Sequence, residues 1–437
     1  MITPESKENH AGEPPMAVAA SASCETAAGK LPKISVGIAS YNYERYIGEA
    51  IESVLSQEGV DLELIVCDDQ STDGSERVIR SFSDPRLRYY RNPTKLGNFG
   101  TNNRCLALAR GVYVAFLDSD DRMRPGNLWE KARFLDRHPE VGLVYSACQM
   151  IDSTGQIVGL DRRFEQSYVA APRVELERFM FDNHIPSCST VMVRRECFDE
   201  LGAFDESFTH SGDYDMWRRI AARYHVAFLA EPLVERRRHD HNFTSRAVVD
   251  GRVEAESIRA VEEIFATLPP ELADLTDRRP RALAHTLLRF AGCYLALGDH
   301  ERGRDSLQRA IHLAPEIASE PEAVLGVLLG PSITPWIRDR LTYVDAVFAN
   351  LPPEASHLRS FARHARARVY LERVFAATSS NRARRAHDLW QGLRLDPSWL
   401  RNRGVQILAL ETLLGHHAVE GVRSIVRPWR RADPGTP

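Results

Sequence analysis

The chain has 437 residues, of which 43% are hydrophobic and 27% charged, a composition typical of a globular protein large enough for more than one domain. A net charge of −4 argues against a general nucleic-acid-binding protein, so we expect no nucleic-acid partner. The seven cysteines include no CxxC pair and favour reduced thiols over a disulfide scaffold.

Residues 1–30 are rich in Ala, Pro and Ser and are predicted to form a disordered tail. They lack the apolar segment of a signal peptide, and no later segment offers the roughly 18 consecutive apolar residues of a membrane span. We therefore expect a cytoplasmic protein.

From residue 31 onward, apolar β-branched segments alternate with helical periodicity. We expect helices near 49–57, 75–82, 99–109 and 125–137, and strands at 34–40, 62–67, 86–92, 112–117 and 141–151. Asn42 is expected to cap the first helix. This order predicts an α/β fold with a mostly parallel sheet and helices on both of its faces.

Polar clusters follow three of these strands: "SYN" (40–42), "CDDQSTDGS" (67–75) and "DSDD" (118–121). In open parallel sheets, ligands bind beyond the carboxyl ends of the strands. We therefore expect the three clusters to meet at one edge of the sheet.

Past about residue 255 few strand signals occur, and the spacing of Ala291, Tyr294, Gly298 and Leu307 resembles a tetratricopeptide-type repeat over 281–316. A weaker copy lies at 379–399, and a generic helical bundle explains both equally well. We predict a tail at 1–30, an α/β domain at 31–255 and a helical domain at 256–437.

Asp118, Asp120 and Asp121 lie together at a strand end, where adjacent carboxylates repel unless a cation or hydrogen-bond donors compensate. A hard divalent cation prefers carboxylate and phosphate oxygens. The alternative is a solvated strand end with no ligand.

Three further segments carry candidate chemistry. Asp69 leaves a strand into a polar turn, where its carboxylate could accept an N–H from a nucleobase, while Thr72 or Asp73 suits a helix cap. Asp213 and Asp215 precede a basic helix, either to interact with its dipole or to accept a proton from an alcohol. In "RRRHDHNFTS" (236–245), His239 and His241 suit a metal, a phosphate or a solvated loop.

Five segments share the order and spacing of one family: "SVGIASYNYERYIGEAIESVLSQ", "LIVCDDQSTDGS", "LGNFGTNNRCLALARGVYVAFLDSDD", "GDYDMWRR" and "RRRHDHNFTS". Together they resemble the family 2 glycosyltransferases, which have the GT-A (Rossmann-like) nucleotide-diphospho-sugar transferase fold. The resemblance covers residues 33–245, about half of the chain.

The resemblance implies roles for individual residues. It implies that Ala39 and Tyr41 line the nucleotide site. It also implies that Asp69 recognises the base and that Asp118 contacts the ribose. It makes Asp120 the direct metal ligand and places His239 near the diphosphate and metal. Asp213 matches the catalytic acid of a Glu-Asp motif.

This chain departs from the family pattern in two ways. Gly212 replaces the Glu of the Glu-Asp motif, which leaves the choice of catalytic base open between Asp213 and Asp215. No QxxRW segment and no flanking membrane spans occur, which argues against a processive membrane-embedded synthase.

The resemblance implies an inverting glycosyltransferase that uses Mg2+ or Mn2+ and a nucleotide-sugar donor, with a UDP-sugar favoured. The acceptor would be a glycan, a lipid-linked sugar or a protein, in the synthesis of bacterial surface glycans. The helical domain could recognise an acceptor, a partner protein or a second copy of the chain. The basic segment 421–437 could contact a membrane surface peripherally, although a solvated tail explains it more simply.

Two alternatives differ in class. A nucleotidyltransferase would need a Gly-rich basic loop after the first strand, which "ASYNYERYIG" lacks. A catalytically inactive scaffold acting through its helical domain would release no nucleotide from a sugar donor.

Overall fold

Four parallel strands form the N-terminal half of one sheet in the computed structural model, which describes residues 33–239, 250–328, 330, 339–376, 382–402, 404–406 and 409. Their order is β3-β2-β1-β4. The strands are β1 (Ile34–Ser40), β2 (Leu62–Asp68), β3 (Leu87–Arg91) and β4 (Tyr113–Phe116). The intervening helices are α1 (Ile47–Leu55), α2 (Ser75–Ile79) and α3 (Gly97–Leu108). The alternation predicted from the sequence is confirmed here.

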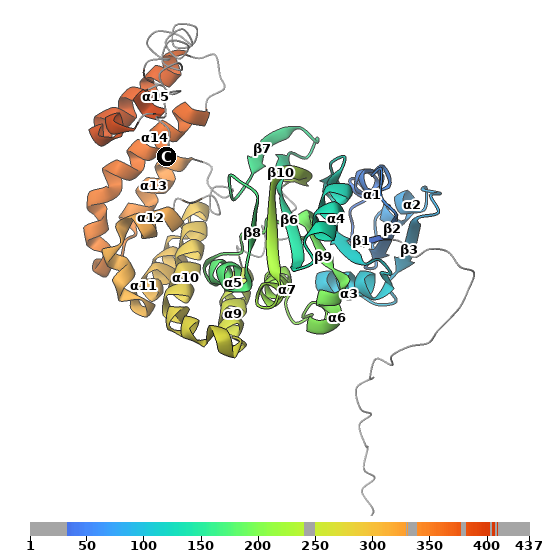
Figure 1. Ribbon diagram of the computed structural model, residues 1–437. Coiled ribbons are helices and arrows are strands. Elements are labelled where there is room, and N and C mark those ends of the chain that lie inside the picture. The colour runs from blue at the N-terminus through green and yellow to red at the C-terminus, as the bar shows by residue number, and fades with distance from the viewer. Residues whose placement is uncertain are drawn as a thin grey trace, which may run out of the picture. The chain divides into compact units, whose positions relative to one another are not determined.

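The second half of the sheet contains both parallel and antiparallel pairs, so the expectation of a mostly parallel sheet holds only for the first half. Strand β9 (Val191–Arg194) lies antiparallel between β4 and β6 (Val141–Ile151), and β10 (His225–Arg237) runs parallel to β6. Three short antiparallel strands complete the sheet, namely β5 (Arg122–Met123), β7 (Ile157–Asp161) and β8 (Tyr168–Ala170). The fold is thus a mixed α/β sheet (Figure 1).

Helices cover both faces of the sheet because successive strand residues point to opposite sides. On one face, Ile34, Val36 and Ile38 of β1 pack with α1 and with α4 (Asn127–Arg137). On the other face, Ile65 and Cys67 of β2 pack with α3. This arrangement leaves the carboxyl ends of the strands open at one edge.

Further helices pack on the α3 face of the sheet. They are α5 (Pro172–Phe181), α6 (Arg195–Leu201), α7 (Gly212–Ala221) and α9 (Arg252–Ala266), with the 3-10 turn η1 (Cys188–Thr190) leading into β9. The same apolar core contains Trp217 of α7 and Val261 of α9. Helix α9 is therefore packed into the core of the α/β region.

The described residues after 250 contain helices and turns only. The α-helices that follow α9 are α10 (Arg279–Leu297), α11 (His300–Leu313), α12 (Pro321–Leu328), α13 (Arg340–Ala349), α14 (Ala362–Ala376) and α15 (Arg382–Leu395). Short 3-10 segments join them at η2 (Pro270–Arg278), η3 (Pro315–Ser319), η5 (Pro353–Phe361) and η6 (Pro397–Arg401). The helical character of this region agrees with the sequence prediction.

Helices α10 and α11 form a hairpin at the position of the predicted repeat (Figure 1). Gly298 ends α10 with a φ of 83°, a conformation that glycine adopts without strain, and the Asp299 carboxylate caps α11 by accepting the N–H of Arg302. Membership in the tetratricopeptide class, and the domain boundary at 255/256, stay predictions. The predicted tail at 1–30, His241 and the segment 421–437 lie outside the described residues.

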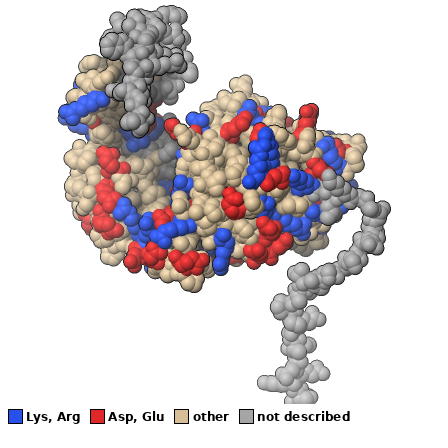
Figure 2. All heavy atoms as spheres, in the orientation of Figure 1, with Lys and Arg blue, Asp and Glu red and all other residues tan. Residues whose placement is uncertain are grey.

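No helix in the described part of the chain is long and apolar enough to cross a bilayer. Acidic and basic side chains are interspersed on the face that Figure 2 shows, as the near-neutral net charge leads one to expect. The absence of a nucleic-acid partner stays a prediction.

Candidate active site

The polar clusters that follow β1, β2 and β4 meet at one edge of the sheet. Ser40 lies opposite Asp68 in the parallel β1–β2 pair, so the residues that follow both strands leave the sheet side by side. The Ser119 hydroxyl donates to the carbonyl oxygen of Ala39 at 2.8 Å, which holds the "DSDD" segment against the end of β1. The shared edge expected from the sequence therefore exists.

Asn42 ties the loop after β1 to the loop after β2 and does not cap α1, contrary to the sequence expectation. Its side-chain oxygen accepts the N–H of Thr72 at 2.8 Å, and its own N–H donates to the Ser71 hydroxyl at 2.9 Å. Helix α1 begins five residues later, at Ile47, and has no side-chain cap. Asn42 and Gln70 both have positive φ angles, 59° and 66°, a strain typical of functional loops.

Asp69 is buried, and its carboxylate is largely occupied by hydrogen bonds within the chain. One oxygen, Oδ1, accepts the Asn92 amide and the Leu96 N–H, both at 2.7 Å. The other, Oδ2, accepts the Gly97 N–H at the start of α3 at 2.9 Å. Since a carboxylate oxygen has two lone pairs, Oδ2 retains capacity for one more donor.

Ala39 lies in the neighbouring strand β1, and Tyr41 follows the end of that strand. Tyr41 is 39% exposed, and the Lys95 ammonium lies 3.5 Å from the centre of its ring. This is a short cation–π distance, and it places a positive charge over the Tyr41 ring in the loop that follows β1.

Asp121 holds the acidic segment in place. Its carboxylate accepts the Ser189 hydroxyl at 2.6 Å and the N–H of Arg237 at 2.8 Å, which joins the segment to η1 and to the end of β10. Ser189 in turn accepts the N–H of Asp118 at 3.0 Å. Asp121 is therefore a structural member of the cluster.

Asp118 lies where negative charge is poorly compensated. Burial and the neighbouring charge of Asp120 raise the pKa of Asp118 to about 6, although the charge of Arg236 lowers it. Asp213 on α7 contributes a smaller increase, so the two acids lie within electrostatic reach of each other. Such a site favours a bound cation.

Asp120 and His239 form the pair that suits a metal ion. The Nε2 atom of His239 lies 2.9 Å from Oδ2 of Asp120, and the imidazole stacks on Tyr46 with ring centres 5.3 Å apart. Among the described residues, no group of three or more His, Cys, Asp or Glu side chains is arranged to hold a metal by itself. One or two protein ligands completed by substrate phosphates is a common arrangement for Mg2+, so the donor set fits.

Asp213 is in the first turn of α7, and its carboxylate is only partly exposed. Burial raises its pKa to about 6, while a hydrogen bond from the Tyr214 N–H and the charge of Arg236 lower it. No ion pair of Asp213 occurs among the described contacts. A carboxylate with this pKa is ionised at neutral pH and basic enough to accept a proton from an alcohol.

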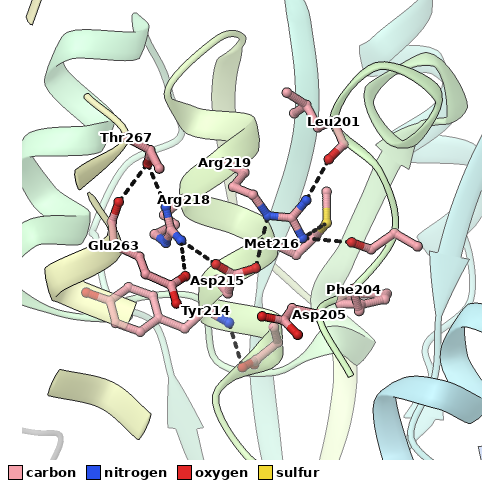
Figure 3. Close-up of polar contacts among 12 residues, drawn as sticks. Leu201, Phe204, Asp205, Tyr214, Asp215, Met216, Arg218, Arg219, Glu263 and Thr267 are labelled. Carbon is pink, nitrogen blue, oxygen red and sulfur yellow. Dashed lines mark hydrogen bonds and ion pairs between the residues drawn. The ribbon is translucent and has the colours of Figure 1, made fainter. Parts of the chain in front are cut away.

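Asp215 is buried and engaged in ion pairs. Its Oδ2 accepts Nε of Arg219 at 2.9 Å, and its Oδ1 binds Arg218 (Figure 3). Both carboxylate oxygens point toward these guanidinium groups, which belong to the same helix. Of the two candidate bases, the geometry therefore favours Asp213 and gives Asp215 a structural function.

Comparisons with known proteins agree with this geometry. The family model described as "Glycosyl transferase family 2" matches residues 35–202. An uncharacterized glycosyltransferase of Methanocaldococcus jannaschii is 30% identical over 211 residues, covering 47% of this chain and 71% of that protein. The chain belongs to the family 2 glycosyltransferases.

The chain is also similar in sequence to a bacterial enzyme and in structure to a solved protein. The Escherichia coli UDP-Glc:alpha-D-GlcNAc-diphosphoundecaprenol beta-1,3-glucosyltransferase WfgD is 31% identical over 187 residues, covering 43% of this chain and 69% of WfgD. The crystal structure of S. aureus TarS superposes with a TM-score of 0.50 at 18% identity, covering 75% of this chain and 55% of TarS. The latter likeness supports the GT-A fold.

Gly212, where the family motif has Glu, lies against an aromatic ring. A Cβ added at this position would meet the Phe99 ring of α3 at 2.7 Å, closer than real Cβ contacts. The Phe99 ring stacks on Phe204, with centres 5.5 Å apart. In this chain, the Phe99 ring therefore occupies the space beside Gly212 that a side chain at this position would need.

We expect Gly212→Ala to destabilise the fold by about 1–3 kcal/mol, because the added methyl group overpacks the site against Phe99. Chemical denaturation measures the loss. Gly326→Ala is the matched control, since Gly326 is an exposed helical glycine with open space at its Cβ position, where alanine should be neutral or stabilising. Equal stability of Gly212→Ala and the parent enzyme would contradict the expectation.

Two residues that were not predicted from the sequence contribute to the site. Ser189 joins Asp118 to Asp121, and no local pattern distinguishes it from other serines. Arg236 is the guanidinium whose charge lowers the pKa of both Asp118 and Asp213. The sequence prediction for segment 236–245 concerned His239 and His241 and gave its arginines no role at the acidic cluster.

Proposed function

We propose that this enzyme transfers a sugar from a nucleotide-sugar donor, in the simplest case a UDP-sugar, to a hydroxyl group of an acceptor with inversion at the anomeric carbon. The observation that carries the proposal is the gathering of Asp69, Asp118 and Asp120 at the strand ends, with Asp213 within electrostatic reach of Asp118. The relative WfgD, by its name, uses UDP-Glc and a diphosphoundecaprenol-linked acceptor. We extend that substrate class to this chain, in bacterial surface glycan synthesis.

In the proposed complex, the strand ends hold the nucleotide. The free lone pair on Oδ2 of Asp69 accepts an N–H of the base, and Tyr41 and Ala39 line the same site. Asp118 contacts the ribose. Lys95, which lies over Tyr41, adds a positive charge near the anionic donor.

Asp120 and His239 would hold a Mg2+ or Mn2+ ion. When bound, such an ion stabilises the negative charge that develops on the diphosphate leaving group. Asp213 accepts the proton of the acceptor hydroxyl as the oxygen attacks the anomeric carbon, and no covalent sugar–enzyme intermediate is needed. Holding both substrates in the reactive orientation lowers the activation free energy by roughly 7–11 kcal/mol more.

The activity is tested with UDP-glucose, UDP-galactose, UDP-N-acetylglucosamine and GDP-mannose, each assayed for nucleotide release with and without a lipid-linked sugar acceptor. We expect release from at least one donor. Release no greater than in an Asp213→Asn variant, for every donor, would contradict the proposal and favour an inactive scaffold. The anomeric configuration of the product, measured by NMR, tests inversion.

The pH dependence follows from the raised pKa of Asp213, about 6. Because the base must be ionised, kcat should fall about tenfold per pH unit below pH 6. A profile of kcat between pH 4.5 and 8.5 measures this limb. A rate independent of pH across 5–7 would contradict the assignment of Asp213.

The raised pKa of Asp213 has the opposite consequence for stability: ionisation of this carboxylate increases kcat but lowers the free energy of unfolding. The pKa of Asp213 in the folded state, about 6, exceeds its ordinary value of 3.8, so the contribution of this group to stability is present at low pH and lost as pH rises through 6. Ionised Asp213 therefore destabilises the enzyme at neutral pH, where the proposed reaction requires it.

A further inference from the structure

Glu256 of α9 binds the backbone that leads into the proposed catalytic helix. Its carboxylate accepts three consecutive N–H groups, from Thr209 at 3.0 Å, His210 at 2.7 Å and Ser211 at 2.9 Å. It also accepts the Thr209 hydroxyl. Gly212 and Asp213 follow directly, so the carboxylate fixes the segment that delivers Asp213.

Glu256 is ionised when it makes these contacts. Burial acts to raise its pKa, but the hydrogen bonds from Thr209 and from the backbone of His210 and Ser211 lower it below its usual value. Successive N–H groups that converge on an anion form a nest, an arrangement that holds negative charge firmly. The contact is thus a fixed feature at neutral pH.

Other residues on the same face of α9 bind the same region. Arg259 donates to Asp205 at 2.9 Å, and Glu263 accepts from Arg218 at 2.7 Å. Thr267, just after α9, also contacts Arg218, at 3.3 Å. Figure 3 shows Arg218 between Asp215 on its own helix and Glu263 on α9. The spacing 256, 259, 263 and 267 keeps these side chains on one side of the helix.

The segment 205–211 needs such support because it consists of turns and bends. The described hydrogen bond to the Asp213 carboxylate comes from the N–H of Tyr214, its neighbour in sequence. Because donor and acceptor are neighbours on the same helix, that bond does not fix the position of the carboxylate relative to the sheet. The position of Asp213 therefore depends on the core packing of α7 and on what holds residues 209–211.

We propose that Glu256 is a positioning residue for the transfer reaction, which makes α9 part of the catalytic apparatus although it lies outside the segment that the family model matches. The inference rests on the proposed role of Asp213 as the base. It gives the start of the helical region a function in catalysis.

The test compares Glu256→Ala and Glu256→Gln with Glu262→Gln, a matched change on α9 at a half-buried residue that binds Arg279. Using the donor that releases UDP most readily, we expect Glu256→Ala to lower kcat by about 10²-fold, the effect of misplacing a catalytic group by about 1 Å. The Kd for UDP should stay within about twofold of the parent enzyme. Glu262→Gln should retain the parent kcat.

Glu256→Gln separates positioning from a general loss of structure. Its amide oxygen still accepts N–H groups while its NH2 group faces donors, so kcat should fall by less than in Glu256→Ala. Removing the negative charge should also move the acidic limb of the kcat profile to lower pH, since Glu256 raises the pKa of Asp213. The other charges near Asp213, those of Asp118 and Arg236, and the nearby Cys188 thiol are unchanged by this substitution.

Amide hydrogen exchange supplies a readout independent of activity. Exchange should accelerate over 205–217 in Glu256→Ala and stay unchanged in β1 and β2. If Glu256→Ala fails to fold, Glu256→Gln carries the test. Parent-like kcat in both Glu256 variants, or an equal loss in Glu262→Gln, would overturn the inference. An active Asp213→Asn enzyme would instead overturn the role of Asp213 as the base, and the absence of nucleotide release from every donor would overturn the proposed function.

Discussion

Asp213→Asn is expected to lower kcat by about 10²–10⁴-fold, the usual contribution of a general base, while UDP binds as tightly as before. The substitution keeps the shape of the side chain and removes its capacity to accept a proton. Initial rates of nucleotide release with acceptor, together with calorimetry of UDP binding, separate the two effects.

The same variant should be more stable than the parent enzyme. Burial raises the pKa of Asp213 to about 6, so its ionised form costs free energy at neutral pH that a neutral amide does not. Each kcal/mol relieved should raise the melting temperature by roughly 2–4 °C. A variant that is both inactive and more stable cannot have lost activity by unfolding.

Asp215→Asn provides the contrast because Asp215 lies two residues away on the same helix. It removes the charge that binds the buried Arg218 and the half-buried Arg219. Breaking a fully buried pair costs about 3–5 kcal/mol, and less is expected here because Glu263 still binds Arg218. The enzyme that remains folded should keep most of its kcat. A large fall in kcat for Asp215→Asn, with Asp213→Asn active, would exchange the two assignments.

Sequence patterns predicted the parallel half of the fold because its signals are local. Each of β1, β2 and β4 is a short buried apolar run followed by polar residues, with a helix between successive strands. The insertion of β9 between β4 and β6 depends on contacts between distant segments. Periodicity carries no information about such pairing, so the mixed half of the sheet was beyond prediction.

Among the site residues, too, those with a local sequence signal could be predicted and those that depend on contacts between distant segments could not. The cluster at Asp118–Asp121 and the pairing of Asp120 with His239 could be anticipated from the resemblance to the family. The choice between Asp213 and Asp215 could not, because helical spacing alone does not say which acid meets the arginines at 218 and 219. The contact of Glu256 with 209–211 joins residues about 46 positions apart and leaves no sequence signal.

Removing divalent metal should reduce nucleotide release to the background rate, and adding Mn2+ or Mg2+ should restore it. The physical reason is the cluster of acids at the end of β4, where burial and Asp120 raise the pKa of Asp118. This negative charge would repel a donor diphosphate unless a cation lies between them. Rates in EDTA, followed by titration with each metal, measure the dependence.

Asp120→Asn should weaken Mn2+ binding by more than about 100-fold, because it removes a charged ligand. For comparison, losing a partner in the outer shell of a metal site costs about 10–100-fold. Asp136→Asn is the control, since Asp136 is an exposed acid that pairs with Lys33 away from the strand ends. Metal binding can be followed without activity. Mn2+ at 100 times its Kd, added with UDP, should stabilise the parent enzyme by about 2.7 kcal/mol.

The stabilisation by Mn2+ with UDP should disappear in Asp120→Asn and persist in Asp136→Asn. Full activity in EDTA would remove the metal from the proposed mechanism, and Asp118 and Asp120 would then need another cation as partner. Arg236 is the candidate for that role, because its charge already lowers the pKa of Asp118 and of Asp213. The chelation experiment therefore decides whether a metal ion or this guanidinium balances the charge of the diphosphate.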